Sequence, residues 1–326
     1  MNPKGNKIIG IIMGGYSNEN KISLKSGQIV YETLKSDFQC YKIHVNKKKW
    51  ILIDDNGVDH LVEKSTFTVK GMPFLKFDCI FNAIHGSPGE DGVMQNYFNK
   101  LKIPLTGCRR HESELTFDKI RCLNFLSDKG INIAKSIDIN KSTKINIEEI
   151  ERKVGFPCFV KASKSGSSFG VYKVHNKNEL LRCVNSASMV DENILIESYI
   201  EGREFSVGVI TYKNKVEVLP ITEIISSNDF FDYEAKYEGK SNEITPANIS
   251  GKLKSQLERL SEKIYKLLNL RGFSRSEFIV NDSGIYFLET NTVPGLTEES
   301  ILPQQAKCAN ISLKDLFTNA INEVII

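Results

Sequence analysis

Two carboxylates and an amide, Glu277, Glu289 and Asn291, could meet on one face of a β-hairpin near the C-terminal end of the chain. Residues 276–291 form two stretches rich in aromatic and β-branched side chains, separated by Asn-Asp-Ser-Gly, and this pattern predicts paired strands. A three-residue turn with Gly284 in the left-handed conformation places the two glutamates opposite each other when the pairs are counted outward. Because side chains alternate between the faces of a strand, the asparagine shares their face.

Carboxylates held this close repel each other, so the predicted arrangement calls for a cation. Carboxylate and amide oxygens favour Mg²⁺ or Mn²⁺, and Mg²⁺ commonly completes its shell with water and substrate phosphates. The residues also allow a plainer interpretation, in which the two glutamates are ordinary surface carboxylates on a solvated hairpin face.

A second group of residues suits a ligand that carries phosphates. Lys161 is predicted on a strand that leads into the small-residue loop 165–170, whose backbone N–H groups and hydroxyls could close over phosphates. The lysine would supply a point charge to them. A Ser/Gly loop also occurs as a plain turn, and the loop sequence alone leaves both interpretations open. The sequence contains neither the G-x-G dinucleotide fingerprint nor the P-loop pattern.

The N-terminal third of the chain predicts a scaffold for such sites. Three apolar runs suit strands buried on both faces of a parallel sheet: residues 7–13, 41–45 and 79–84. Residues 23–34 have helical spacing, and the alternation predicts an α/β fold with ligands at the carboxyl ends of the strands. Two loops follow such ends, 14–23 and 85–92, and His85 opens the second. This histidine is either a structural residue or a ligand contact.

Composition limits the class of protein. The 326 residues suit two or three domains, and the net charge of +3 is spread too evenly for a nucleic-acid-binding face. Seven cysteines without a C-x-x-C pair fit a reducing cytoplasm better than a disulfide framework or a zinc site. No stretch approaches the ~20 apolar residues that span a bilayer. We expect a cytoplasmic protein without nucleic-acid or membrane partners, and a homodimer, since two-fold dimers are the commonest closed assembly.

Six stretches carry a resemblance to a known family: GGYSNENKISLKSG, HGSPGEDG, the segment around Lys119, VKASKSGSSFG, FFDYEAKY, and SRSEF with LETNTVPGLTEES. In this order the sequence resembles the D-alanine–D-alanine ligases of the ATP-grasp superfamily over most of its length. The resemblance implies a mixed α/β fold of ATP-grasp architecture in three parts: an N-terminal Rossmann-like domain at 1–107, a central ATP-grasp subdomain at 108–193, and a C-terminal ATP-grasp subdomain with the metal site and a lid loop at 194–326.

The implied activity is the ATP-dependent joining of two D-alanines into D-alanyl-D-alanine for peptidoglycan precursor synthesis. ATP would convert the first carboxylate into an acyl phosphate, which the amine of the second D-alanine then attacks. Two Mg²⁺ or Mn²⁺ ions are implied, one held by Glu277 and Glu289 and the other by Glu289 and Asn291.

The resemblance also implies roles for single residues. Eight would surround ATP: Lys119 and Lys161 at its phosphates, Ser167 in the flap, Glu197 with the backbone of Ser198 and Ile200 at the adenine, Glu204 at the ribose, and Lys236 on the lid. Others would meet the two D-alanines: Glu19 at the first ammonium, His85 near its carboxylate, Ser300 at the second carboxylate, and Arg275 with the Gly295 N–H at the tetrahedral intermediate. Tyr237, on a lid expected over 230–248, would complete a hydrogen-bonded chain with Ser167 and Glu19.

Three positions depart from the family's commonest pattern. Glu277 stands where aspartate is more usual, Ala162 where proline is common, and Lys21 where an acidic residue is frequent. Two alternatives compete with the dipeptide ligase, and only the second is of another functional class. One is a related ligase for D-lactate, D-serine or another amino acid, and Tyr237 argues against the lactate version. The other is a nucleotide-binding sensor without turnover, against which the presence of Arg275 and of the lid residues argues.

Overall fold

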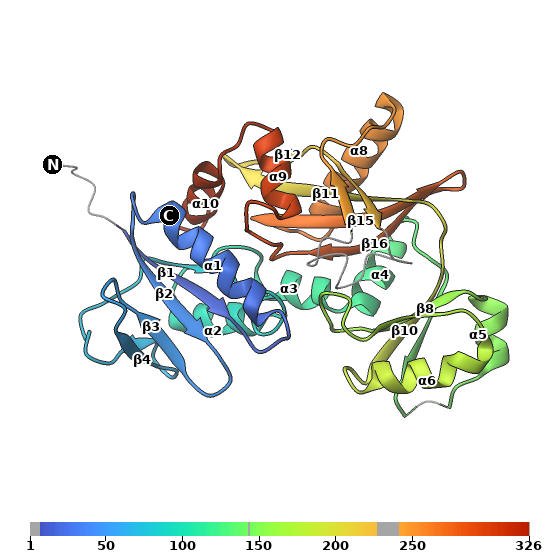
Figure 1. Ribbon diagram of the computed structural model, residues 1–326, viewed down its shortest axis with the longest axis horizontal. Helices are drawn as coiled ribbons and strands as arrows, with labels where there is room; N and C mark the ends of the chain where they lie inside the picture. The colour runs from blue at the N-terminus through green and yellow to red at the C-terminus, as the bar shows by residue number, and fades with distance from the viewer. Residues whose placement is uncertain (1–6, 143, 227–240, 326) are drawn as a thin grey trace.

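Three β-sheets with flanking helices make up the computed structural model, which describes residues 7–142, 144–226 and 241–325 (Figure 1). The first sheet, in blue, lies at one end of the molecule, and the second, in green, lies at the other. The third sheet, which includes the orange strands, lies beside both and carries the C-terminal helices. Within these described ranges, no helix is long and apolar enough to cross a membrane.

The first sheet has the strand order β5-β4-β3-β2-β1-β6. Its strands are β1 (Ile8–Gly14), β2 (Gln39–Val45), β3 (Trp50–Ile53), β4 (Asp59–Glu63), β5 (Thr68–Val69) and β6 (Cys79–Asn82). As the buried apolar runs predict, β1 pairs in parallel with β2 and β6, while β3 to β5 extend the sheet in antiparallel fashion. Helices α1 (Asn20–Leu34) and α2 (Val93–Leu101) follow the two loops at the carboxyl ends of β1 and β6.

The second sheet, in the order β7-β10-β8-β9, is antiparallel throughout. Its elements are β7 (Ser136–Asn140), α5 (Ile147–Lys153), β8 (Cys158–Ala162), β9 (Val171–Val174), α6 (Lys177–Ser188) and β10 (Asn193–Ser198). Strand β10 lies at the domain boundary expected between residues 193 and 194, but it pairs with β7 and β8 of this sheet. The change from the second sheet to the third therefore comes after residue 198. The division into three domains remains a prediction.

Two helices, α3 (Arg110–Phe117) and α4 (Lys119–Ser127), connect the first two sheets. The sequence of residues 113–129 predicts instead one continuous helix that carries Lys119 in its first half, and this prediction is wrong. Asp118 interrupts the stretch with an extended backbone, and its carboxylate accepts a hydrogen bond from the Arg121 N–H at 3.3 Å. This is the geometry of a helix N-cap. Lys119 is therefore the first residue of α4 rather than an interior helical residue.

The third sheet has the order β14-β13-β11-β15-β16, with β12 paired to β11. Its elements are β11 (Arg203–Tyr212), β12 (Lys215–Val218), β13 (Thr222–Ser226), β14 (Ser241–Ile244), α8 (Gly251–Leu267), β15 (Phe273–Asn281), β16 (Gly284–Asn291), α9 (Ile301–Cys308) and α10 (Leu313–Asn322). Phe205 and Phe278 face a buried apolar cluster that includes Leu257 and Ile264 of α8. A second cluster joins Phe81 of the first sheet to Phe317 of α10, so the C-terminal helices pack against the N-terminal part.

The β15–β16 hairpin closes differently from the prediction. Asn281 pairs with Gly284 across a two-residue loop, so the predicted three-residue turn is wrong. A β-bulge then shifts the register between Glu277 and Phe278, because β16 contains one extra residue there. The shift restores the expected pairing of Glu277 with Glu289.

Candidate active site

One face of the third sheet carries the predicted metal ligands together with the predicted oxyanion donor. Glu277 is the Cα partner of Glu289, and Arg275 is the partner of Asn291. Residues two apart on one strand share a face, so the four side chains form two adjacent rows across β15 and β16. The predicted convergence of two carboxylates and an amide on one face of the hairpin is therefore observed.

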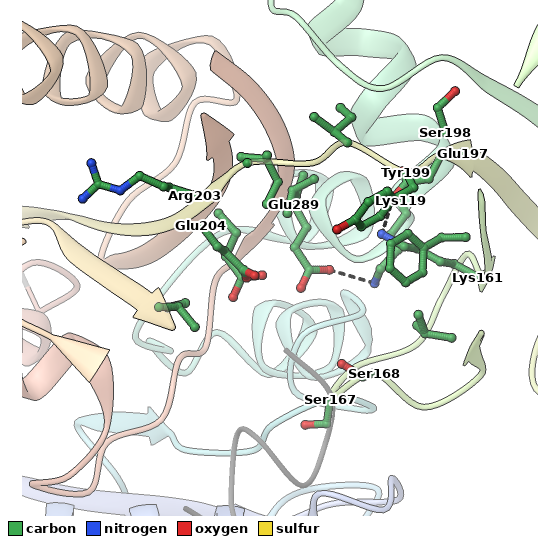
Figure 2. Close-up of a pocket in the computed structure, with 18 of the residues that line it drawn as sticks. Lys119, Lys161, Ser167, Ser168, Glu197, Ser198, Tyr199, Arg203, Glu204 and Glu289 are labelled. Carbon is green, nitrogen blue, oxygen red and sulfur yellow. Dashed lines mark ion pairs between the residues drawn. The ribbon is translucent and has the colours of Figure 1, made fainter. Parts of the chain in front are cut away.

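A cavity of about 510 Å³ opens between the second and third sheets, a volume that suits a small-molecule ligand. Seven residues expected to surround ATP line it: Lys119, Lys161, Ser167, Glu197, Ser198, Ile200 and Glu204. Figure 2 shows Glu204 and Glu289 directed into the space beside Lys161 and Lys119. The eighth, Lys236, lies outside the described residues, as does Tyr237, the predicted lid residue of the chain with Ser167 and Glu19.

A buried ion pair joins Lys161 on β8 to Glu197 on β10, two neighbouring strands of the second sheet (Figure 2). Burial lowers the pKa of Lys161, but the carboxylates of Glu197, Glu289 and Glu277 outweigh it and raise the pKa overall. The lysine is therefore charged in the cavity. Glu197 was expected at the adenine, and in the structure its carboxylate holds this lysine.

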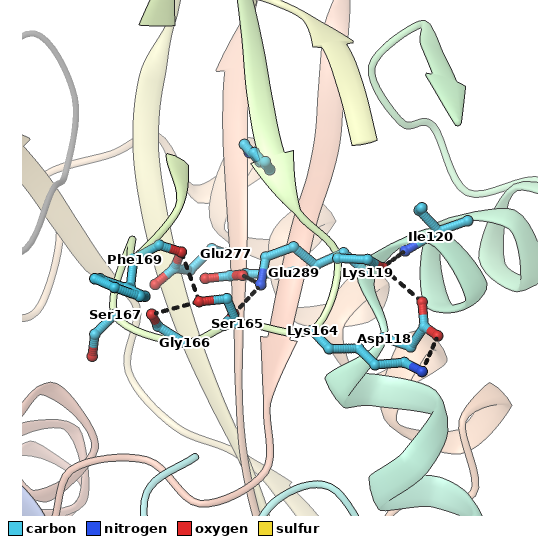
Figure 3. Close-up of polar contacts among 12 residues, drawn as sticks. Asp118, Lys119, Ile120, Lys164, Ser165, Gly166, Ser167, Phe169, Glu277 and Glu289 are labelled. Carbon is cyan, nitrogen blue, oxygen red and sulfur yellow. Dashed lines mark hydrogen bonds and ion pairs between the residues drawn. The ribbon is translucent and has the colours of Figure 1, made fainter. Parts of the chain in front are cut away.

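Lys119 links the third sheet to the loop 165–170 (Figure 3). Its Nζ lies 3.1 Å from Glu289 Oε2 and donates a hydrogen bond of 2.7 Å to the Ser165 carbonyl. The N-terminus of α4 is fixed to the end of β8, because the Lys119 N–H donates to the Ser163 carbonyl at 3.1 Å. Asp118 accepts a hydrogen bond from Ser163 Oγ at 2.8 Å. The helix cap thus sets the position of the lysine.

Loop 165–170 covers the cavity and meets the N-terminal part of the chain. Ser165 Oγ donates to the Phe169 carbonyl at 2.6 Å, which closes the loop on itself. Ser167 Oγ donates to Glu19 Oε1 at 2.5 Å across 148 residues of sequence. The expected contact between these two side chains is present, whereas their roles toward a substrate remain predictions.

A smaller cavity of about 60 Å³ adjoins the large one and shares Lys119, Ser167 and Glu289 with it. Its lining also includes Glu19, Glu90, Arg275 and Asn291, from both the N-terminal part and the third sheet. Two neighbouring cavities, one large and one small, suit a reaction between a large ligand and a small one.

Glu90 is a site residue for which the sequence analysis assigned no role. It is buried, and its carboxylate accepts hydrogen bonds from the N–H groups of Gly86 at 2.6 Å and Val293 at 3.1 Å. Burial and the nearby Glu19 carboxylate raise the pKa of Glu90 to about 8. An acidic residue in a glycine-rich loop after a buried strand is the signal that could have identified it.

His85 is buried and held at both ring nitrogens. Nδ1 lies 2.7 Å from the Val293 carbonyl and Nε2 lies 2.8 Å from Ser26 Oγ. Since a carbonyl can only accept, Nδ1 carries the proton and Nε2 accepts from the serine hydroxyl. Burial lowers the pKa of His85, which keeps the imidazole neutral. It is not among the described residues that line the two cavities.

Gly295 and Ser300 are packed against each other at the start of α9. A Cβ on Gly295 would meet Ser300 Oγ at 2.6 Å, so the glycine allows this approach. Ser300 is the N-cap residue of α9, and its hydroxyl lies 2.8 Å from Thr297 Oγ1. Neither residue belongs to the described lining of the two cavities, and their roles toward a substrate remain predictions.

The predicted metal ligands fit a divalent cation that also binds phosphates. The part of the chain that the structure describes contains no cluster of three or more His, Cys, Asp or Glu side chains able to hold a metal. Two carboxylates and one amide leave coordination positions for phosphate oxygens and water, the ligands that Mg²⁺ prefers. Each of the two carboxylates forms an ion pair in the structure, Glu289 with Lys119 and Glu277 with Arg275. Both therefore lie where a positive charge is stabilised.

Comparison with known proteins places the chain in one family. Residues 8–108 match the sequence model described as "D-ala D-ala ligase N-terminus", and residues 125–322 match "D-ala D-ala ligase C-terminus". A D-alanine--D-alanine ligase from Flavobacterium johnsoniae is 53% identical over 318 residues, which covers 97% of this chain and 98% of that protein.

Solved structures agree with the sequence comparison. The VanG D-Ala:D-Ser ligase from Enterococcus faecalis matches with a TM-score of 0.84 at 30% identity, covering 98% of this chain and 99% of that one. A D-alanine--D-alanine ligase from Bacillus anthracis complexed with ATP matches with a TM-score of 0.80 at 29% identity, covering 98% and 97% of the two chains. The chain, with its ATP-grasp fold, belongs to the D-alanine–D-alanine ligase family.

Proposed function

We propose that the chain joins two D-alanines into D-alanyl-D-alanine in the two adjoining cavities, with ATP in the larger one, for peptidoglycan precursor synthesis. Family membership supports the reaction. The observation that supports its location is the gathering of Lys161, Glu277 and Glu289 from two sheets, and of Lys119 from helix α4, around one cavity of about 510 Å³. Two lysines facing two carboxylates suit a triphosphate that binds together with a metal ion.

In this proposal the phosphates of ATP lie between the two lysines and loop 165–170. Lys161 is held in a charged state by Glu197, and Lys119 is fixed by the cap of α4 and by Glu289. The adenine would contact the segment of Ser198 to Ile200, and the ribose would contact Glu204. The Ser198 N–H donates to the Lys135 carbonyl at 2.9 Å, so contact with the adenine falls to other backbone groups of this segment.

Glu277 and Glu289 would hold one Mg²⁺ or Mn²⁺ ion, and Glu289 and Asn291 the second. When bound, such ions neutralise the charge of the phosphates and make the terminal phosphorus easier to attack. Lys119 lies 3.1 Å from Glu289, so it would contribute positive charge on the same side of the ligand.

The small cavity would bind the D-alanine whose carboxylate is activated. Glu19 contributes an acidic side chain that suits an ammonium group, and Glu90 adds a second one whose pKa burial raises to about 8. Arg275 on the same lining would stabilise the negative charge of the tetrahedral intermediate, a contribution of about 10²–10³ in rate for one such donor. At the start of α9, Ser300 would bind the carboxylate of the second D-alanine, and the Gly295 N–H would join Arg275 at the tetrahedral intermediate.

We also propose a cytoplasmic homodimer. All seven cysteines are free thiols, six of them buried, which fits a reducing compartment. Sedimentation at micromolar concentration tests the assembly, since a chain of 36.8 kDa would sediment with about twice that mass.

The experiment that tests the function is release of ADP by the purified protein with Mg-ATP and a panel of acceptors, with products identified by mass. D-alanine alone should give the dipeptide, and L-alanine should give none. D-alanine combined with D-serine or D-lactate measures the choice of second substrate. If turnover requires D-serine, the chain is a ligase of the same family with D-serine as its second substrate. No turnover with any pair, together with ATP binding, would support the sensor alternative instead.

A further inference from the structure

Ser206 lies next to the proposed oxyanion donor in the centre of the third sheet. It is fully buried on β11, and its Cα partner on β15 is Glu277. Its hydroxyl accepts a hydrogen bond of 3.1 Å from Arg275 Nη1. The same Nη1 atom is paired with the carboxylate of Glu277. One nitrogen of the guanidinium is thus held by a neutral oxygen and by an anionic one.

The two acceptors differ in what a bound metal would do to them. Glu277 is a proposed metal ligand, and a carboxylate that binds Mg²⁺ has less charge to offer Arg275. Ser206 Oγ is not a proposed metal ligand, so it would keep its hydrogen bond to Arg275 if the Glu277 carboxylate turned toward a metal ion. A neutral acceptor also leaves the positive charge of the guanidinium available for a developing oxyanion, which a carboxylate partner would partly cancel.

The backbone of Ser206 is fixed by the helix that carries Ser300 at its N-terminus. Gln305 of α9 donates to the Ser206 carbonyl at 2.8 Å and to Thr222 Oγ1 at 3.0 Å. The close approach requires Gly208, where a Cβ would meet Gln305 Oε1 at 2.5 Å. Strand β11 and helix α9 are therefore joined at the serine, and the backbone that carries its hydroxyl is held in place.

We propose that Ser206 is a positioning residue for the ligation step, which holds the Arg275 guanidinium in place when Glu277 binds a metal ion. The proposal rests on the role that we propose for Arg275. A displacement of about 1 Å at a catalytic group lowers rates by up to about 10²-fold, so loss of one hydroxyl beside it should have a kinetic effect.

The test compares Ser206→Ala with Ser206→Thr, which keeps a hydroxyl, and with a matched control. Ser276→Ala is that control, because Ser276 is a buried serine of β15 on the opposite face, where its hydroxyl lies 2.5 Å from Thr290 Oγ1. We expect Ser206→Ala to lower kcat about tenfold with an unchanged KM for ATP, and to release more ADP than dipeptide. The kcat of Ser206→Thr and the kcat of the control Ser276→Ala should each stay within about threefold of the wild-type value.

Arg275→Lys separates this proposal from the role of Arg275 itself. If Ser206 acts through Arg275, Ser206→Ala should have little further effect in an Arg275→Lys background, because neighbouring residues in one network are not additive. Full activity of Arg275→Lys would refute the role of Arg275. A low activity of Arg275→Lys with a normal kcat for Ser206→Ala would refute the role of Ser206 alone.

Circular dichroism and urea unfolding establish that the variants are folded before kinetics are compared. If Ser206→Ala does not fold, Ser206→Cys keeps the side-chain volume but offers a weak acceptor, and the same loss of kcat is expected. An equal loss of activity and of stability in Ser206→Ala and Ser276→Ala would overturn the proposal, because it would indicate a general effect of removing a buried hydroxyl.

Discussion

Replacing Lys161 by methionine tests whether the ion pair with Glu197 is as deeply buried as the structure indicates. The two side chains are 16% and 5% exposed, so solvent screens their interaction little. The substitution keeps most of the apolar stem but leaves the Glu197 carboxylate buried without its cation. Breaking a buried pair in this way costs about 3–5 kcal/mol of unfolding free energy, or roughly 200- to 5,000-fold in the folding equilibrium.

Urea unfolding followed by circular dichroism measures this loss. The double variant Lys161→Met with Glu197→Leu removes both charges, and we expect it to recover most of the lost stability, since an apolar pair of similar volume is often as stable as a buried ion pair. Both variants should bind ATP more weakly, because each lacks the lysine. A loss of less than about 1 kcal/mol in Lys161→Met would refute the reasoning, since that value is typical of a solvated pair.

Three further substitutions test other contacts of the site. In Gly166→Ala a Cβ would meet Glu19 Oε2 at 2.5 Å, and we expect about a tenfold higher KM for D-alanine in initial-rate assays. In Gly295→Ala a Cβ would meet Ser300 Oγ at 2.6 Å, and about a tenfold lower kcat/KM for the second D-alanine should result. Because the pKa of Glu90 is raised to about 8, the folded protein holds a proton that the unfolded chain has lost, and stability should fall as the pH rises from about 5 to about 8. Glu90→Gln should reduce that fall in urea unfolding measured across the same range.

The β15–β16 hairpin shows what sequence patterns predict well and what they miss. Alternation of side chains predicted that Glu277 faces Glu289, and this pairing is correct. The turn was wrong by one residue, and the bulge compensates for it. Local patterns define the strands well, but a bulge depends on how two strands twist against their neighbours, which the sequence of one hairpin does not reveal.

Helix ends and strand edges were harder to predict than buried strands. Lys119 was expected inside a helix, whereas Asp118 caps a new helix just before it. Strand β14 (Ser241–Ile244) lies inside the segment 230–248 that we expected to be a lid. The charged and aromatic residues of that segment do not alternate clearly, so its sequence does not predict a strand. Propensity and spacing describe a segment by itself, and tertiary packing decides such cases.

Contacts between distant parts of the chain lay beyond the sequence patterns altogether. Glu90 accepts a hydrogen bond from Val293, 203 residues away, and Arg275 reaches Ser206 across 69 residues. Such contacts form when sheets and helices pack together, and the residue pattern within one segment does not predict them. The resemblance to a family supplied the roles that these patterns could not.

The most direct test of the proposed site is product formation by the wild type and by Glu289→Gln with Mg-ATP and D-alanine. The substitution keeps the size of the side chain but removes the charge that lies 3.1 Å from Lys119 and that both proposed metal ions share. We predict D-alanyl-D-alanine and an equal amount of ADP from the wild type, and less than about 1% of that rate from a folded Glu289→Gln variant. Wild-type rates from this variant would contradict the assignment of the hairpin face as the catalytic site.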